Sequence, residues 1–405
     1  TNAYYLHCFS VKQPDLKWEN PKVRQEVYDL MEFWFEKGVD GFRMDVISFI
    51  SKDTSFPELP ESYNGEFIPF YSNGPKLHDY LQEMNEQVLS KYDIMTVGEA
   101  PGVDINRALE FVDEDRKELN MFFHFDLMEL DREQGETFVM AKEPWKLSEF
   151  KKIHSKWDEV FSKKGWGSMF LNNHDFPRTV SRWGNDSRTH WYNSATMLQT
   201  FLLSMRGTPF FYYGEEIGMT NVKFENISDY QDINTINRYK LEKQNGGDLN
   251  AFLQNEKHAS RDNARTPMQW NTSANAGFTT AKPWLKVNEN FKEGINAASQ
   301  EDDKTSVLNF FRKMVQVRKN HQTLVYGTYN LELAENEQVY AYTRTLDDKR
   351  YLVMLSFSTK KTTVAFDHLN FNRVELVVSN DDIYKTGALK RFELMPYQAT
   401  IYQLF

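Results

Sequence analysis

Three carboxylates, Asp45, Glu99 and Asp175, each close a short segment that has the character of a strand end. Carboxylates that follow successive strands of a (β/α)₈ TIM barrel point into one cavity at the C-terminal face of the barrel. Paired carboxylates in such a cavity cleave glycosidic bonds. We therefore expect these three residues to be catalytic and to act on a glycoside.

The segment that ends at Asp45 combines this carboxylate with a cation. Because alternate residues of a strand share a face, we expect Arg43 and Asp45 to point into the barrel while Phe42 and Met44 face the surrounding helices. An arginine two residues from a carboxylate keeps the carboxylate ionised. An ionised carboxylate at the barrel mouth is a good nucleophile toward an anomeric carbon. The alternative interpretation is a structural ion pair inside the barrel.

The second carboxylate, Glu99, comes directly after Gly98. Because Gly98 has no side chain, we expect it to leave room for a substrate. A general acid at neutral pH needs a raised pKa, which burial or a neighbouring negative charge can supply. Asp45 is the candidate for that charge. The alternative is a carboxylate that caps the next helix.

Polar residues also gather at the third strand end, where two asparagines precede His174 and Asp175. Packing does not call for such a run at the end of a buried strand. His174 and Asp175 could donate to and accept from sugar hydroxyls, in bonds that tighten as the ring flattens. A fourth segment carries Arg261 and Arg265 among polar groups that suit sugar recognition. The alternatives are a structural histidine and a solvated loop.

The elements around these residues alternate between helices and short buried strands, a pattern that predicts a parallel sheet. Asn20 and Pro21 are a typical helix start. The count of strands is five rather than eight. We therefore expect strands four to eight of the barrel, with the first three lying before Thr1. The expected helices cover residues 23–36, 77–89, 147–161, 192–205 and 307–319, and the expected strands cover residues 39–45, 93–99, 121–125, 168–173 and 209–213.

The chain divides into three expected regions. Residues 1–20 have the character of the end of an excursion, and residues 21–323 form the partial barrel. Within it, residues 221–300 are irregular and rich in Asn, Asp and Tyr, which predicts a long loop excursion. Residues 324–405 change to short alternating strands and predict a small antiparallel β domain. Its expected strands are 338–345, 351–356, 362–365, 374–378 and 399–404.

Size and composition are compatible with this organisation. The 405 residues suffice for a barrel of about 250 residues and a further domain. The net charge of −10, with mixed signs along the chain, argues against a nucleic-acid partner. The single cysteine, Cys8, allows no intramolecular disulfide and suits a reducing compartment. No run of about 18 apolar residues predicts a membrane span. We therefore expect a cytoplasmic monomer whose partner is a small oligosaccharide, with neither nucleic acid nor membrane.

Five segments, in this order, resemble glycoside hydrolase family 13, the α-amylase-like retaining enzymes. Within the family the pattern is similar to the oligo-1,6-glucosidase and dextran glucosidase branch. The resemblance implies a catalytic barrel, an inserted domain after strand three, whose end would be residues 1–20, and a C-terminal β domain. The segments are GFRMDVI at 41–47, VGEAPGV at 97–103, NNHD at 172–175, GEEIGMTN at 214–221 and RDNARTPMQW at 261–270.

The resemblance also implies a role for each of the three carboxylates. Asp45 is similar to the family's nucleophile, Glu99 to its acid/base residue, and Asp175 to the transition-state stabiliser that binds ring hydroxyls. Together these roles imply a two-step reaction that retains the anomeric configuration.

Four more residues take substrate-binding roles through the resemblance. Arg43 and His174 are similar to contacts of subsite −1, and Arg261 to a contact with the non-reducing end that makes such enzymes exo-acting. Val46 follows the nucleophile, where a valine in this branch goes with α-1,6 linkages and a threonine with α-1,4. The resemblance implies no cofactor, and we assign no metal.

The leading hypothesis is a retaining exo-acting α-glucosidase that hydrolyses α-1,6 bonds at the non-reducing end of isomalto-oligosaccharides. Trehalose-6-phosphate hydrolase, sucrose isomerase and α-1,4-glucosidase of the same family remain open, and Val46 speaks against the last. A non-catalytic homologue is the alternative from another class. Such homologues tend to lose the carboxylates, whereas this chain keeps all three.

Overall fold

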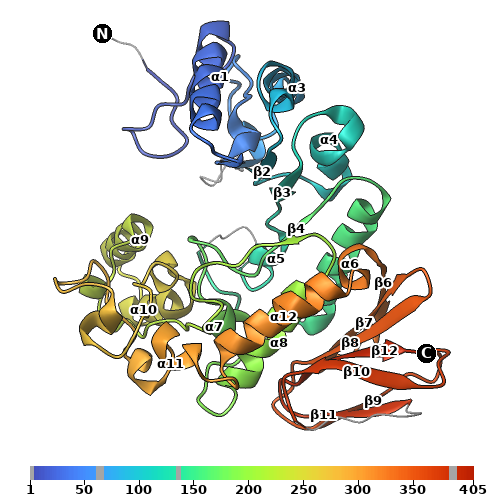
Figure 1. Ribbon diagram of the computed structural model, residues 1–405. Helices are drawn as coiled ribbons and strands as arrows, with labels where there is room; N and C mark the ends of the chain where they lie inside the picture. Colours follow the sequence, from blue (N-terminus) through green and yellow to red (C-terminus); the bar gives the residue numbers. More distant parts are fainter. Residues whose placement is uncertain (1–3, 61–67, 134–137, 383–389) are drawn as a thin grey trace. The chain divides into compact units, whose positions relative to one another are not determined.

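The computed structural model describes residues 4–60, 68–133, 138–382 and 390–405, so the first three residues of the expected 1–20 region lie outside it. The chain forms two compact units. The first unit comprises Thr1–Asp126 and Lys156–Ser168, and the second comprises Leu127–Ser155 and Met169–Phe405. Three elements run from the sequence of one unit into that of the other: α5 (Asp126–Glu129), α6 (Leu147–Lys163) and β4 (Ser168–Met169) (Figure 1).

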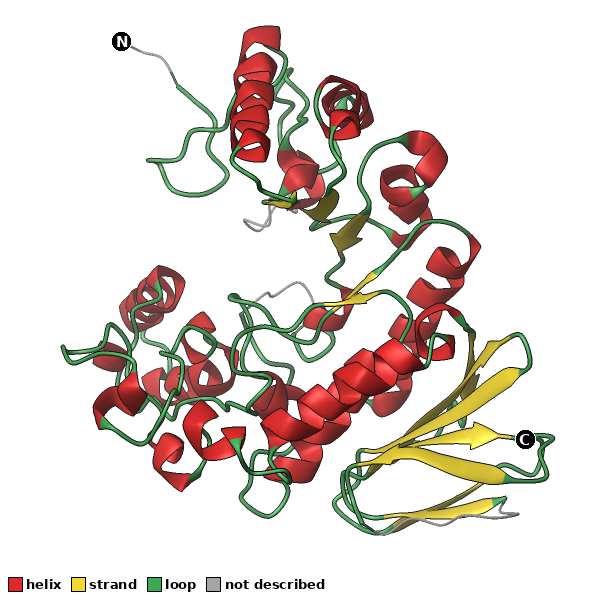
Figure 2. Ribbon diagram, viewed as in Figure 1, coloured by secondary structure: helices red, strands yellow, loops and turns green. Residues whose placement is uncertain are grey.

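The first unit contains a parallel sheet with the strand order β1-β2-β3. Helices precede or connect the strands, as Figure 2 shows, so the predicted alternation of helix and strand is confirmed here. The strands are β1 (Gly41–Met44), β2 (Met95–Glu99) and β3 (Met121–Phe123), and the helices are α1 (Pro21–Glu36), α2 (Ile68–Tyr71), α3 (Leu77–Gln87) and α4 (Ala108–Val112).

Helix α1 begins where the sequence predicts it. The Asn20 side chain accepts a hydrogen bond from the Lys22 N–H, Pro21 takes the first helical position, and Gly38 follows the end in a left-handed conformation. The buried side chains are Tyr28, Met31 and Phe35.

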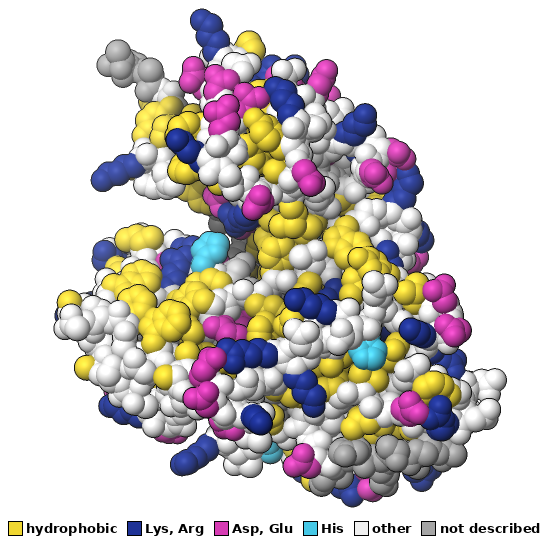
Figure 3. Space-filling view, viewed as in Figure 1, with side chains coloured by type: hydrophobic (Ala, Val, Ile, Leu, Met, Phe, Trp, Pro, Cys, Tyr) yellow, Lys and Arg dark blue, Asp and Glu magenta, His cyan; other side chains and the backbone are white. Residues whose placement is uncertain are grey.

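Only part of the apolar face of α1 is buried. Phe35 packs on Phe42 of β1, with ring centroids 4.9 Å apart, which confirms the predicted outward direction of Phe42. Leu30 and Trp34, which share the helical spacing of the buried residues, are instead exposed. Figure 3 shows such hydrophobic side chains among the charged ones on the surface of the first unit.

Strands β4 and β5 (Thr208–Pro209) form a two-stranded sheet, and both strands are shorter than predicted. The Phe210 N–H still donates to the Met169 carbonyl at 2.8 Å. Beyond that point a side chain takes the place of backbone pairing between the strands. Asn173 Oδ1 accepts the Asp175 N–H at 2.7 Å. Asp175 therefore lies in a turn several residues past its strand rather than at the strand end.

The expected loop excursion at 221–300 is not irregular throughout, because it contains three helices: α9 (Ile233–Gln244), α10 (Leu249–Ala259) and α11 (Ala297–Glu301). A side-chain cap begins each of them. Asp232 accepts the Thr235 N–H, Asp248 accepts the Asn250 and Ala251 N–H groups, and Asn296 accepts the Ser299 N–H. The Asn and Asp residues that suggested a loop are in part helix caps.

Three further helices belong to the second unit. They are α7 (Thr179–Trp183), α8 (Trp191–Ser204) and α12 (Val307–Asn320), and the last two pack against each other. Helix α8 also packs against strands β8 (Lys349–Ser356) and β12 (Ala399–Leu404) of the C-terminal sheet. Its Ser204 Oγ lies 2.6 Å from the hydroxyl of Tyr342, which belongs to the neighbouring strand β7 (Val339–Leu346). The helices predicted at 192–205 and 307–319 are thus confirmed.

The C-terminal region contains a five-stranded antiparallel sheet with the order β10-β12-β8-β7-β6 and a separate pair, β11-β9. All five predicted strands are present, while β6 and β11 were not predicted. A short helix, α13 (Thr323–Tyr326), precedes them. The strands are β6 (Thr328–Glu332), β7 (Val339–Leu346), β8 (Lys349–Ser356), β9 (Thr362–Ala365), β10 (Val374–Ser379), β11 (Arg391–Leu394) and β12 (Ala399–Leu404).

Hydrogen bonds connect helix α6 to the loop between β6 and β7. The Lys151 ammonium is buried and donates to the carbonyls of Leu333 at 2.8 Å and Asn336 at 2.5 Å. Glu337 Oε2 accepts the Leu147 N–H at 2.7 Å at the start of the helix. Burial lowers the pKa of Lys151 to about 8.

Replacing Lys151 by Met is expected to lower the free energy of unfolding by about 1–3 kcal/mol, because buried carbonyls lose their donor. Urea denaturation measures this loss, and Lys152→Met, a change at the exposed neighbouring lysine, is the matched control. In the unfolded chain Lys151 keeps its proton up to about pH 10.4, whereas native Lys151 releases it near pH 8. Between these two pH values the unfolded state binds more protons than the native state. The stability of the wild type relative to Lys151→Met should therefore increase as pH rises through this range. Equal stability of the wild type and Lys151→Met at every pH would contradict the expectation.

Candidate active site

The first unit brings four of the predicted site residues together at the ends of β1 and β2. Arg43 lies between two carboxylates: Nη2 is 2.9 Å from Glu99 Oε2, and Nη1 forms an ion pair with Asp45 Oδ1. The fourth residue is Val46, whose backbone N–H donates to Glu99 Oε2 at 3.0 Å. The shared face of Arg43 and Asp45, predicted from the period of the strand, is what allows this arrangement.

Val46 has an unusual backbone conformation. Its φ of 37° and ψ of 45° lie in the left-handed region, which a β-branched side chain rarely occupies. Such a conformation costs about 1–3 kcal/mol and persists only where the surroundings enforce it. The residue in this conformation is also the one whose N–H donates to Glu99 Oε2.

The two carboxylates of this group have contrasting surroundings. Glu99 is 7% exposed, whereas the Asp45 side chain is 76% exposed and paired with Arg43. Burial raises the pKa of Glu99; the Val46 N–H and the Arg43 charge lower it, and the Asp45 charge raises it further. A buried carboxyl held toward its neutral form beside an exposed one is the arrangement that separates an acid from a nucleophile.

Gly98 does not have the role that the sequence suggested. A Cβ atom added at Gly98 would lie 2.7 Å from Leu119 Cδ1 and 2.8 Å from Ile47 Cγ2. The space beside Gly98 is therefore filled by apolar side chains, because Gly98 and Glu99 face opposite sides of β2. This glycine allows close packing, and the expectation of room for a substrate at that point is wrong.

The second unit brings together the remaining predicted residues around Asp175. Its Oδ1 accepts from Arg265 Nη2 at 2.6 Å and from Arg261 Nη1 at 3.2 Å. His174 Nε2 lies 3.3 Å from Asp175 Oδ2, and the His174 carbonyl accepts from Arg265 Nε at 2.8 Å. Two guanidinium groups therefore fix the position of the Asp175 carboxylate.

Two members of this second group were not predicted as site residues. Arg265 makes the shorter contact with Asp175, although only Arg261 was assigned a role; its place in the same segment was a usable signal. Asp232 is buried, caps α9 and pairs through Oδ1 with Arg261 Nη2 at 3.0 Å. No local pattern could have identified Asp232, because its partner lies in a distant segment.

Within residues 4–60, 68–133, 138–382 and 390–405, no group of three or more His, Cys, Asp or Glu side chains is placed to hold a metal ion. In the same part of the chain, no helix has the length and apolar character to cross a membrane.

Comparison with known proteins identifies relatives of this chain in both sequence and fold. The chain matches the family "Alpha amylase, catalytic domain" over residues 1–327 and the family "Maltogenic Amylase, C-terminal domain" over residues 330–401. It is 49% identical over 412 residues to an oligo-1,6-glucosidase from Parageobacillus thermoglucosidasius, which covers 100% of this chain and 72% of that protein. The oligo-1,6-glucosidase of Bacillus cereus is 46% identical over 408 residues, with the same coverage.

Solved structures give the same result. The isomaltulose synthase SmuA of Protaminobacter rubrum has a TM-score of 0.96 at 41% identity, covering 100% of this chain and 72% of that one. The trehalose-6-phosphate hydrolase of Bacillus licheniformis has a TM-score of 0.92 at 41% identity, covering 99% and 72%. The fold class is thus a TIM-barrel catalytic domain followed by an antiparallel β domain. The chain belongs to the α-amylase family of glycoside hydrolases, family 13.

Proposed function

We propose that the protein is a retaining, exo-acting α-glucosidase that hydrolyses α-1,6 bonds at the non-reducing end of isomalto-oligosaccharides. The observation that carries the proposal is the pair formed by buried Glu99 and exposed Asp45 on one arginine, Arg43. Oligo-1,6-glucosidases at 44–49% identity over 99–100% of the chain support the choice of linkage.

In the first step Glu99 donates its proton to the glycosidic oxygen while an Asp45 oxygen attacks C1. The C1–O bond breaks, the alcohol leaves, and a glucosyl ester forms on Asp45. Burial supports this role for Glu99 because it raises the pKa and favours the protonated form. Arg43 supports the role of Asp45 because their ion pair fixes the position of that carboxylate.

In the second step Glu99 takes a proton from water, and the water oxygen attacks C1. The C1–O bond to Asp45 breaks, the Asp45 carboxylate is restored, and α-glucose leaves. The change of role has a physical cause within the first unit. The negative charge of Asp45 is one of the causes that raise the pKa of Glu99, and ester formation removes that charge. The pKa of Glu99 then falls, and the same carboxyl group becomes a better base.

For the second unit we propose that Asp175 stabilises the transition state by binding ring hydroxyls. His174 would contribute to subsite −1, as would Arg43 of the first unit. Arg261 would bind the non-reducing end. The ion pairs of Asp175 with Arg261 and Arg265 support this role, because they hold the carboxylate in place as an acceptor for sugar hydroxyls. Bonds of this kind that strengthen in the transition state supply part of the catalysis.

We further propose that β1 to β5 are the fourth to eighth strands of the barrel. The domains would be residues 1–20 as the end of an inserted domain, 21–323 as the catalytic barrel, and 324–405 as the β domain. The single cysteine, Cys8, supports a cytoplasmic location, and we expect a monomer that acts on small oligosaccharides without a cofactor.

The purified protein is expected to release glucose from isomaltose with a kcat/KM at least tenfold above that on maltose. Val46→Thr should shift this ratio toward maltose, since both residues are β-branched and the substitution leaves the backbone strain at position 46 unchanged. Initial rates of glucose release on both disaccharides measure the ratio. A wild type that prefers maltose, or a ratio unmoved by Val46→Thr, would contradict the assignment of Val46.

Trehalose-6-phosphate hydrolysis is the second candidate, because a trehalose-6-phosphate hydrolase from Bacillus subtilis is 41% identical over 100% of the chain. Isomaltulose synthases among the similar structures make sucrose isomerisation a third. Trehalose-6-phosphate and sucrose therefore belong in the same assay. A higher kcat/KM on either of them than on isomaltose would replace the leading proposal.

A further inference from the structure

The second unit contains a buried guanidinium group that the proposed mechanism does not use. Arg178 is 0% exposed and lies three residues after Asp175. Its Nη1 donates to the Tyr213 carbonyl at 2.5 Å, its Nε to the Asn263 carbonyl at 3.2 Å, and its Nη2 to the Thr266 carbonyl at 3.3 Å. One side chain thus binds three backbone carbonyls from two distant segments.

These contacts connect the two parts of the chain that meet at Asp175. The acceptors Asn263 and Thr266 lie on either side of Arg265 in the sequence, and Asn263 follows Arg261 by two residues. Arg178 itself continues the segment that carries Asp175. The guanidinium fork therefore holds the backbone of the arginine segment at a fixed place relative to the backbone of Asp175.

The surrounding residues leave space for this fork and reinforce it. Gly214 has a φ of +88°, and a Cβ there would lie 3.0 Å from Arg178 Nη1 and 2.4 Å from Met219 Sδ. The Tyr213 ring centroid is 4.7 Å from the guanidinium carbon. The Tyr213 hydroxyl donates to the Thr266 carbonyl at 2.7 Å. The segment 213–214 is thus also tied to the arginine segment.

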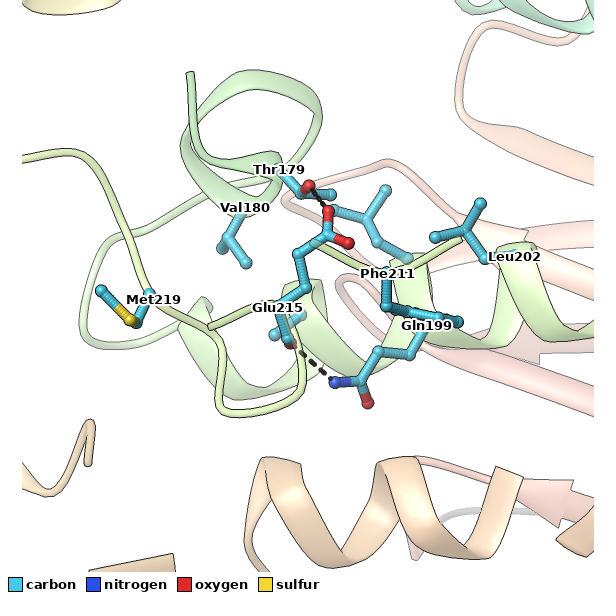
Figure 4. A pocket seen from close by; sticks show the side chains of 9 residues that line it. Thr179, Val180, Gln199, Leu202, Phe211, Glu215 and Met219 are labelled. Carbon is cyan, nitrogen blue, oxygen red and sulfur yellow. Dashed lines mark hydrogen bonds between the residues drawn. The ribbon is translucent and has the colours of Figure 1, made fainter. Parts of the chain in front are cut away.

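Arg178 acts through directed hydrogen bonds rather than through a salt bridge. No carboxylate among residues 4–60, 68–133, 138–382 and 390–405 lies within 4 Å of its guanidinium nitrogens. The nearby carboxyl group of Glu215 is engaged elsewhere: its Oε2 accepts the Tyr212 N–H at 2.8 Å, and its Oε1 accepts from Thr179. Figure 4 shows the Glu215 side chain directed at Thr179, with Gln199 bound to the Glu215 carbonyl.

We propose that Arg178 is a positioning residue for the group formed by Asp175, Arg261 and Arg265, and this inference rests on the function proposed for Asp175. By fixing the carbonyls of Asn263 and Thr266, Arg178 places both arginines on Asp175 Oδ1. A lysine keeps the charge but has no planar fork, so it cannot hold both segments in this geometry.

The test is Arg178→Lys in the full chain, assayed on whichever of isomaltose, maltose, trehalose-6-phosphate and sucrose the wild type converts best. A displacement of about 1 Å at a substrate-binding group can cost about 100-fold in rate. Because Asp175 is proposed to bind more tightly in the transition state than in the ground state, the loss should fall on kcat, with KM within about threefold of the wild type.

Arg318→Lys is the matched control. Arg318 is also buried and donates to backbone carbonyls, those of Met205 at 2.7 Å and Gly207 at 2.6 Å, but it has no contact with the segments around Asp175. Both variants should lose a similar amount of thermal stability. Only Arg178→Lys should lose about 100-fold in kcat, while Arg318→Lys should keep kcat within about twofold.

A milder variant tests the inference even if Arg178→Lys does not fold. Thr266→Val keeps the side-chain shape and the backbone carbonyl but removes the hydroxyl that Arg178 Nη2 contacts at 3.2 Å. It should lower kcat several-fold with little change in melting temperature. An active wild type, with kcat unchanged in Thr266→Val and in folded Arg178→Lys, would overturn the inference. A wild type that converts none of the four sugars would instead overturn the proposed function.

Discussion

Replacing Asp45 by Asn is expected to lower kcat on isomaltose by a factor of about 10⁴–10⁶, the range seen when a covalent nucleophile is removed. The amide has the size of the carboxylate but no negative charge to attack C1. Arg43 keeps its contact with Glu99 at 2.9 Å, so the local fold should survive. Initial rates of glucose release measure the effect, with circular dichroism as the check on folding.

A nearby carboxylate provides the control for this prediction. Asp40 precedes β1 and is exposed. Asp40→Asn should leave kcat within about twofold of the wild type, because substitutions at exposed positions outside the site usually have small effects. Mass spectrometry of rapidly quenched wild-type protein should also find one glucosyl unit on the peptide that contains Asp45. If Asp45→Asn kept more than about one percent of the wild-type kcat, the nucleophile would have to be sought elsewhere.

Replacing Glu99 by Gln is expected to lower kcat on isomaltose by about 10²–10⁴, the usual contribution of general acid catalysis. The loss in kcat/KM should be much smaller on p-nitrophenyl α-glucoside, whose leaving group departs without protonation. This difference between substrates separates a missing proton donor from general damage to the site. An equal loss on both substrates would contradict the role of Glu99 as acid.

The same variant predicts a change in the pH profile. Glu99 must be protonated in the first step, and burial raises its pKa, so wild-type kcat/KM should fall as pH rises through that raised pKa. In Glu99→Gln this alkaline limb should disappear. An alkaline limb that persists in the variant would assign this ionisation to another group.

Much of the fold could be predicted from local patterns because those patterns are strong where an element is both regular and buried. The runs before Asp45 and Glu99 are apolar and short, and both are strands. Helix α9 was missed because its sequence, INTINRYKLEKQ, has few apolar side chains to mark a buried face. Its start was visible in principle, since Asp232 is a favourable cap.

The site could be predicted where its geometry follows from a single element, and not where it depends on contacts between distant segments. Arg43 and Asp45 were paired correctly because residues two apart in a strand share a face. Asp232 and Arg178 were not predicted, since their contacts join residues 29 to 88 positions apart. Such contacts leave no periodic signal in one sequence.

The left-handed backbone at Val46 has a consequence for the engineering of this enzyme. Asn and Gly occupy that conformation more readily than valine, by roughly 1–2 kcal/mol per residue. A library selected only for thermostability would therefore enrich Asn or Gly at position 46 and discard the side chain proposed to set linkage preference. Substrate choice and folding stability compete for the same residue, so stability screens should hold Val46 constant while varying the rest of the chain.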